Sequence, residues 1–173
     1  MAASPLLAGI FPGRIVSCTH LESSQVPEKY VLLLQHKRHM TLTMEETHGF
    51  KVTLEVIQSD TTSDTMSREI VLRGCDNGVA VLYAIAKVYL NAFAPAARDD
   101  IVAAKEPLGH ILVKHKVERE VFFESLLEVD LTESLRTHLN ISSSSKLYGR
   151  LAYIVCNGQR GIDLLEVVLP IEA

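Results

Sequence analysis

The sequence predicts a single α+β domain in which a mostly antiparallel β-sheet carries helices packed on one side. Two hairpin signals, Asn77-Gly78 and Asn157-Gly158, each join two segments of strand-like composition. The length of 173 residues fits one ordinary domain. No repeat is visible at the periods typical of solenoids, and Ser142 to Ser145 is too short for a linker. We therefore assign residues 1–173 to one domain.

Composition excludes several classes of protein. An apolar fraction of 47% is too high for a disordered chain, and a net charge of −4 argues against a nucleic-acid partner. No apolar run approaches the roughly 20 residues of a membrane span. The N-terminus has only a short apolar patch, Leu6 to Phe11, and lacks the features of a secretory signal. Three widely spaced cysteines without a CxxC pair favour a reduced, cytoplasmic protein with no zinc site.

In chain order, the first elements alternate between helix and strand. Apolar residues at helical spacing predict a helix from Pro27, and a second helix over Thr41 to Thr47 that Gly49 ends as a C-cap. Lys51 to Gln58 alternates between apolar and polar residues, which is typical of a half-buried strand. Ser59 to Ser67 is polar without periodicity, and we expect a loop there.

The middle of the chain contains the first predicted hairpin. Arg68 to Arg73 is a strand, Gly74 to Gly78 is the turn, and Val79 to Leu90 is a long apolar strand. Pro95 suits a first helical turn, and acidic residues follow it, so we predict a short helix that reaches Ala104.

The last third of the chain is predicted to be mainly extended. Gly109 to Val117 is predicted as a strand, Arg119 to Val129 as an extended or mixed segment, and Thr132 to Leu139 as a short helix. Leu147 to Cys156 and Ile162 to Leu169 form the second hairpin.

Two charged residues break the pattern of their strands. Glu166 lies in an apolar strand, where a lone buried carboxylate would cost several kcal/mol unless it is paired. The alternative is an edge strand that turns Glu166 to water. Arg68 shares strand parity with Ile70 and Leu72, which places it at the end of an apolar face. It would bind a carboxylate through two hydrogen bonds there, unless it snorkels to solvent.

Other motifs have ordinary interpretations. Pro107-Leu108-Gly109 is typical of a turn. In Tyr148-Gly149-Arg150, Gly149 permits close backbone approach and Arg150 is interpreted as solvated. His36 to His39 forms an HxxH, but its cationic neighbours favour a solvated helix end over a metal site. No GxSxG, GxGxxG or P-loop supports serine hydrolysis or nucleotide chemistry.

Taken in order, from about Val31 to Pro170, these segments resemble the chorismate pyruvate-lyase family. The segments that carry the resemblance are Leu32 to Leu34, Met40 to Glu45, Arg68 to Leu72, Pro107 to Gly109, Leu147 to Arg150 and Leu165 to Pro170. Some members of the family place an arginine in the strand near Ile85, and this chain has none there.

The resemblance implies a chorismate lyase-like fold and a carbon-oxygen lyase. Such an enzyme eliminates pyruvate from chorismate to give 4-hydroxybenzoate, and it needs no metal or cofactor. Arg68 would hold the ring carboxylate, beside the backbone at Leu108 and Gly109. Met40 would cover the ligand. Glu166 would contact the oxygen at the opposite end of the ring, either as a general acid or as a hydrogen-bond partner.

Two alternatives stay open. One is a non-catalytic domain that binds aromatic acids, because the fold resembles the effector-binding domains of certain bacterial transcription regulators. The other is a lyase for a modified chorismate in a secondary-metabolite pathway. About 30 residues precede the matched region, too few for a winged helix. The expected partners are small molecules, and the expected assembly is a monomer or a small homo-oligomer.

Overall fold

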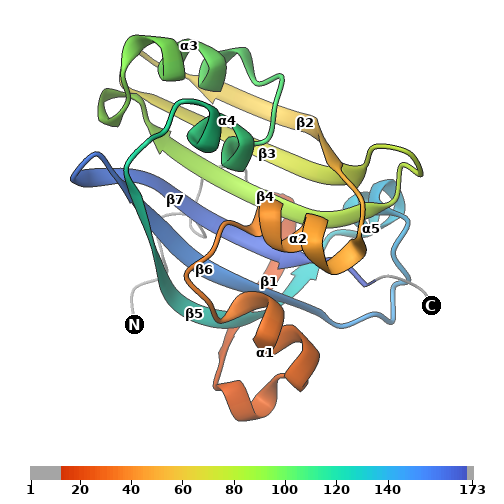
Figure 1. Cartoon of the computed structure of the whole chain (residues 1–173). Helices are drawn as coiled ribbons and strands as arrows, with labels where there is room; N and C mark the ends of the chain where they lie inside the picture. Colours follow the sequence, from red (N-terminus) through yellow and green to blue (C-terminus); the bar gives the residue numbers. More distant parts are fainter. Residues whose placement is uncertain (1–12, 171–173) are drawn as a thin grey trace.

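The computed structural model describes residues 13–170, in which seven strands form one antiparallel sheet (Figure 1). The strands are β1 (Ile15–Leu21), β2 (Val52–Thr61), β3 (Thr65–Gly74), β4 (Ala80–Tyr89), β5 (Arg119–Leu131), β6 (Leu147–Cys156) and β7 (Gln159–Val168). Their order across the sheet is β1-β5-β6-β7-β4-β3-β2, and every neighbouring pair is antiparallel. The predicted α+β class is confirmed.

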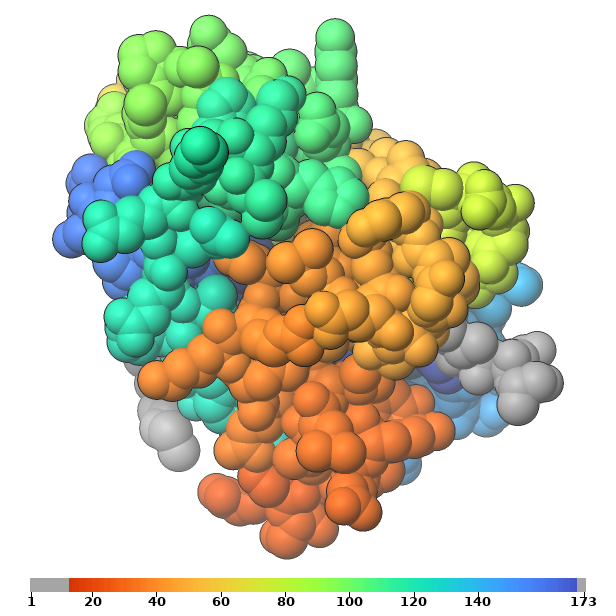
Figure 2. Space-filling model, in the orientation of Figure 1, coloured from red at the N-terminus to blue at the C-terminus, as the bar shows by residue number. Residues whose placement is uncertain are grey.

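Five α-helices and two short 3₁₀ turns join the strands within this range. They are η1 (Ser23–Gln25), α1 (Glu28–Leu34), α2 (Met40–His48), η2 (Leu90–Ala92), α3 (Pro95–Ala103), α4 (Leu108–Lys114) and α5 (Glu133–Leu139). Helices α1 to α4 cover one face of the sheet (Figure 1). In the space-filling view, residues of α2 and α4 hide the strands behind them (Figure 2). Leu135 and Leu139 of α5 belong to the core cluster on the opposite face.

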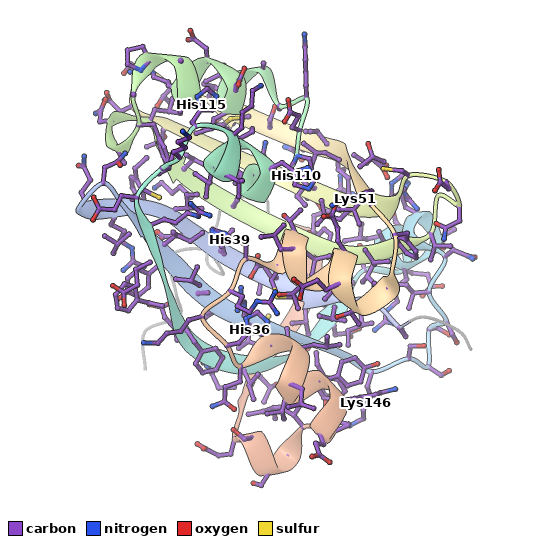
Figure 3. All side chains as sticks on the ribbon, in the orientation of Figure 1. His36, His39, Lys51, His110, His115 and Lys146 are labelled. Carbon is purple, nitrogen blue, oxygen red and sulfur yellow. The ribbon has the colours of Figure 1, made fainter. Side chains whose placement is uncertain are left out.

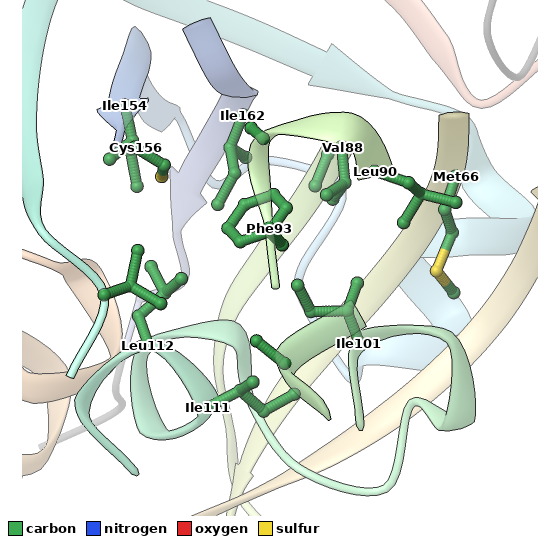
Figure 4. Packing of buried hydrophobic residues seen from close by; sticks show 14 of the residues in the cluster. Met66, Val88, Leu90, Phe93, Ile101, Ile111, Leu112, Ile154, Cys156 and Ile162 are labelled. Atoms are coloured by element: carbon green, nitrogen blue, oxygen red, sulfur yellow. The ribbon is translucent and has the colours of Figure 1, made fainter. Parts of the chain in front are cut away.

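The core between the helices and the sheet is densely apolar. Ile101 of α3 and Ile111 of α4 point toward the strands, where Phe93, Val88 and Ile162 lie in the same cluster (Figure 4). Strand β4 contributes Tyr83 and Ile85 to the core on one face of the sheet and Ala84 and Val88 to the core on the other, which explains its nearly continuous apolar sequence. The other predicted strands and helices form as expected, apart from three differences.

The first difference is that the predicted strand at Gly109 to Val117 is wrong, because this segment forms helix α4. Leu108, Ile111 and Leu112 follow helical spacing, and the last two are fully buried. Pro107 is the N-cap. A short apolar run fits the residue spacing of a strand as well as that of a helix, and contact with α3 selects the helix here.

The second difference is that the predicted loop at Ser59 to Ser67 is mostly strand. Strand β2 continues to Thr61 and β3 begins at Thr65, because Ser59 pairs with Arg68 and Thr61 pairs with Met66. Strand β2 lies at the edge of the sheet, so polar residues can face water along it without breaking the ladder.

The third difference is strand β1, which was not predicted. It pairs with β5 at the other edge of the sheet, and four of its seven residues are exposed, so its sequence has little apolar periodicity. The apolar patch at Leu6 to Phe11 lies outside the described residues. At the end of α2, Gly49 is the predicted C-cap, with a φ of 71°.

Close approach of two strands explains Gly149. A Cβ at this position would lie 2.6 Å from the backbone oxygen of Glu166 and 3.2 Å from Cγ2 of Val167. The absence of a side chain therefore lets β6 and β7 pair at this point, directly beside Glu166.

We predict that Gly149→Ala lowers the free energy of unfolding by about 1–3 kcal/mol, because the added methyl must push β6 away from β7. Urea unfolding measures this change. Val16→Ala is the matched control, since Val16 is exposed on an edge strand and should change the value by less than about 0.5 kcal/mol. An unchanged urea midpoint for Gly149→Ala would contradict the close contact.

Candidate functional site

Glu166 is paired with an arginine at the centre of the sheet. Strand β7 lies between β6 and β4, and Arg150 of β6 is the direct cross-strand neighbour of Glu166. The Nε of Arg150 donates a 2.7 Å hydrogen bond to Oε2 of Glu166. Their relative exposures are 0% for Arg150 and 6% for Glu166. The edge-strand alternative for Glu166 and the solvated interpretation of Arg150 are both wrong, because neither strand is an edge.

The rest of the Arg150 guanidinium holds the connection between α1 and α2, residues 35–39, which we call the covering segment. Nη1 donates to the carbonyl oxygens of Leu34 at 3.2 Å and His36 at 3.0 Å. Nη2 donates to the carbonyl oxygen of Arg38 at 3.1 Å. One side chain therefore joins the middle of the sheet to the chain that crosses over it.

The two histidines of the covering segment point into this charged environment (Figure 3). Arg119 donates from Nε to Nε2 of His39 at 2.6 Å, so that ring nitrogen acts as an acceptor. Burial, together with the charges of Arg119 and Arg150, lowers the pKa of His39 to about 4. Burial and then the charge of Arg150 also lower the pKa of His36. The prediction of a solvated helix end is therefore wrong, because both histidines are partly buried.

Arg68 of β3 is also buried, and no counter-ion contacts it among residues 13–170. It is 1% exposed, and its Nε and Nη1 have no hydrogen-bond partner among residues 13–170. Burial lowers the pKa of Arg68 to about 10, so the side chain is still cationic at neutral pH. An unpaired buried charge is rare in proteins because it loses its hydration without compensation.

Arg68 and Glu166 line the same cavity on the helix-covered face. On β4, which lies between their strands, Ala86 pairs with Arg68 and Ala84 pairs with Glu166. The two short alanine side chains leave space that larger residues would fill, and both alanines line the cavity. The volume open to a water-sized molecule is about 40 Å³. The remaining wall is mostly apolar and includes Leu164.

Three residues from the covering helices close this cavity: Thr41 of α2, Pro107 before α4 and Leu108 of α4. Of the other predicted site residues, Met40 and Gly109 do not line it. Met40 is buried in the apolar cluster beneath α1 and α2. Gly109 packs against Thr41, since a Cβ on it would lie 2.9 Å from that side chain. Arg68, Glu166 and Leu108 are thus brought together, and Met40 and Gly109 support the cover.

A polar contact joins α2 to α4 at the rim. Oε1 of Glu45 lies 3.1 Å from Nε2 of His110 and accepts from the Val52 amide, and Oε2 accepts from Lys51 (Figure 3). Burial alone would raise the pKa of Glu45. The hydrogen bonds from Lys51 and Val52 and the nearby His110 outweigh burial and hold this pKa below its ordinary value. Because Glu45 is fully paired, the shallow hollow beside it has no free charge to offer a ligand.

The opposite face of the sheet has a buried carboxylate, and it is also paired. Glu69 accepts a 2.8 Å hydrogen bond from the hydroxyl of Tyr83, and Nε of Arg14 lies 3.2 Å from its other oxygen. Burial and the neighbouring Glu69 raise the pKa of Tyr83. Arg68, the neighbour of Glu69 in sequence, is the buried ion that lacks a partner within the described part of the chain.

Residues 13–170 contain no cluster of three or more His, Cys, Asp or Glu side chains placed to hold a metal ion. No helix in this range combines the length and the hydropathy that crossing a membrane requires.

The chain matches no protein-family model, and no curated protein matches its sequence. Its fold is similar to that of PhnF from Mycobacterium smegmatis, with a TM-score of 0.54 and 10% identity over 76% of this chain and 64% of that chain. The separately solved effector domain of PhnF gives a TM-score of 0.54 and 10% identity over 78% of this chain and 95% of that domain. The chain therefore spans less than two thirds of full-length PhnF.

These likenesses confirm the chorismate lyase-like α+β fold and correct the expected activity. The similar structures are a PhnF chain and the effector domain of PhnF, and neither is described as a lyase. The prediction of a carbon-oxygen lyase that converts chorismate to pyruvate and 4-hydroxybenzoate is wrong on this comparison. In this chain, Glu166, the carboxylate predicted as a general acid, already accepts a hydrogen bond from Arg150.

We predict that Arg68→Met raises the free energy of unfolding by about 1–4 kcal/mol, because an apolar side chain of similar length removes an unpaired buried charge. Urea unfolding tests this change. Arg136→Met is the control and should lower stability, since Arg136 is buried but donates to Asp130, Ser142 and Ser145. Equal destabilisation by the two substitutions would show that Arg68 has partners in solution.

We predict that His39→Gln flattens the pH dependence of stability below neutral pH. The native pKa of about 4 lies below the model-peptide value near 6.5, so the unfolded chain binds more protons between these pH values. Wild-type stability therefore falls as pH drops through that range. Removing this group should shrink the loss between pH 7 and pH 5 by about 1–2 kcal/mol. Urea unfolding at both pH values measures it, and the exposed His20→Gln should keep the wild-type slope.

Proposed function

We propose that this chain is a non-catalytic binding domain for a small organic anion with an apolar body, such as an aromatic acid. The anionic group of the ligand pairs with Arg68, and the body lies over Ala84 and Ala86. The observation that carries the proposal is the buried guanidinium of Arg68, which lines a mostly apolar cavity and lacks a partner among residues 13–170.

The donors of Arg68 suit a carboxylate. A guanidinium presents N–H groups in a planar fork and binds a planar anion through two parallel hydrogen bonds. Since burial strengthens such bonds, a ligand anion here supplies the missing counter-charge. Lys, which is more strongly hydrated and lacks the fork, is a poorer choice for the same task.

The far end of the cavity favours a hydrogen-bond donor on the ligand. Glu166 uses Oε2 to accept from Arg150, which leaves Oε1 as the oxygen for a ligand group. A carboxylate only accepts hydrogen bonds, so a hydroxyl or an N–H fits there and a second anion does not. Leu108 would contribute to the cover over the ligand.

The cavity must widen to admit a ring. Its volume of about 40 Å³ is well below the roughly 150 Å³ of a cavity known to bind benzene. Thr41 and Leu108 belong to separate helices that cross the cavity, and their outward movement provides the space. Ligand uptake that requires such opening is slower than diffusion-limited association.

The likeness to the PhnF effector domain supports a binding role, since that domain has the same fold and nearly the same extent. Glu166, the carboxylate that a proton-transfer step would use, already accepts a hydrogen bond from Arg150 through Oε2. The proposal needs no cofactor and treats the bound molecule as a ligand.

We predict that the protein binds benzoate saturably and binds its neutral counterpart benzamide at least about tenfold more weakly, because only the anion pairs with Arg68. Isothermal titration calorimetry measures both ligands. Arg68→Met should abolish the difference between benzoate and benzamide while the protein stays folded. Arg136→Met leaves the cavity intact and is the control for arginine loss. Equal affinity of Arg68→Met and wild type for benzoate would refute the proposal.

A further inference from the structure

We propose that Arg150 is a positioning residue that keeps Arg68 available to a ligand by holding Glu166 away from it. This inference rests on the proposed anion-binding role of Arg68, and it explains how a free cation and a carboxylate coexist in one cavity.

Arg68 and Glu166 carry opposite charges in one cavity, so an ion pair between them would be expected. Both line it, both are buried, and only the strand β4 separates their strands. Opposite charges attract strongly where water is excluded, so a mobile carboxylate would move toward an unpaired guanidinium. The structure nevertheless has no ion pair between Arg68 and Glu166.

Arg150 supplies the competing partner. It is the direct cross-strand neighbour of Glu166, whereas Arg68 lies two strands away and two residues farther along the sheet. The 2.7 Å bond from Nε of Arg150 to Oε2 therefore draws the carboxylate toward β6 and away from β3.

Arg150 itself cannot follow Glu166 across the cavity. Its other two nitrogens donate to the carbonyl oxygens of Leu34, His36 and Arg38, and its side chain is fully buried. To move, the guanidinium would have to leave these carbonyls without partners. The covering segment thus fixes Arg150, and Arg150 fixes Glu166.

Removing Arg150 frees the carboxylate to pair with Arg68. Glu166 would then take the place of the ligand anion, and the cavity would lose its charged anchor. A second change that removes the carboxylate restores the anchor. A purely structural role for Arg150 predicts no such restoration, because Glu166→Gln would add a second defect.

The first test measures benzoate affinity by calorimetry in wild type, Arg150→Gln, Glu166→Gln and the double variant. We expect Arg150→Gln to weaken binding at least about tenfold, within the range of coupling between contacting residues. Benzoate has no hydrogen-bond donor for the free oxygen of Glu166, so Glu166→Gln serves as the reference background, and the double variant should recover to within about threefold of its affinity. Wild-type affinity in Arg150→Gln, or no recovery in the double variant, would overturn the proposal.

The second test needs no ligand and compares the effect of Arg68→Met on the urea midpoint in two backgrounds. In wild type the substitution removes an unpaired charge and should raise the midpoint. In Arg150→Gln it removes one half of a new Arg68–Glu166 pair and should lower the midpoint. The same rise in both backgrounds would overturn the proposal even if benzoate is not a ligand, and a failure of the proposed anion site would appear separately as no binding by wild type.

If Arg150→Gln does not fold, Glu166→Gln decides the question. With Arg150 in place, Glu166 does not compete for Arg68. Arg68→Met should therefore shift the urea midpoint equally with and without Glu166→Gln. Unequal shifts would show that Glu166 reaches Arg68 despite Arg150.

Discussion

The arrangement of the cavity depends on the buried ion pair between Arg150 and Glu166. A buried pair adds little net stability, because the loss of hydration offsets the attraction, and apolar residues of similar volume often serve as well. Its contribution here is geometric. One guanidinium fixes a carboxylate on β7 and three carbonyl groups at or beside the covering segment, so the sheet and its cover keep one relative position.

Charge within the cavity differs in sign from charge over the whole chain. The protein carries a formal net charge of −4, yet the buried layer around the cavity contains Arg68, Arg150 and one carboxylate. Because Arg150 neutralises Glu166, the remaining cation is Arg68. A local excess of one positive charge in a poorly hydrated place determines which small molecules fit, and the net charge of the surface has little influence on that choice.

The breaks in strand pattern singled out Arg68 and Glu166 as candidates, and they did not single out Arg150. A two-residue turn at Asn157-Gly158 with regular pairing would place Arg150 opposite Leu165. A register shift between Ile154 and Val155 moves the pairing by one residue and brings Arg150 opposite Glu166. No residue pattern reveals such a shift. The need of a buried carboxylate for a partner nevertheless pointed to an arginine on the other strand of the same hairpin. The helix α4 was missed because seven apolar-rich residues fit two periods equally well.

The two sides of the cover are held with unequal strength. On the α1–α2 side, Arg150 donates to three carbonyl oxygens from a fully buried side chain, and a charged donor left without its partners in such a place is costly. On the α4 side, the polar link is the contact between Glu45 and the partly exposed His110, where water can replace either partner. For the proposed aromatic ligand, which needs more space than the cavity offers, we expect the cover to yield at its weaker contact. That contact lies between α2 and α4, above Thr41 and Leu108, which leaves Arg150 and Glu166 undisturbed while the ligand enters.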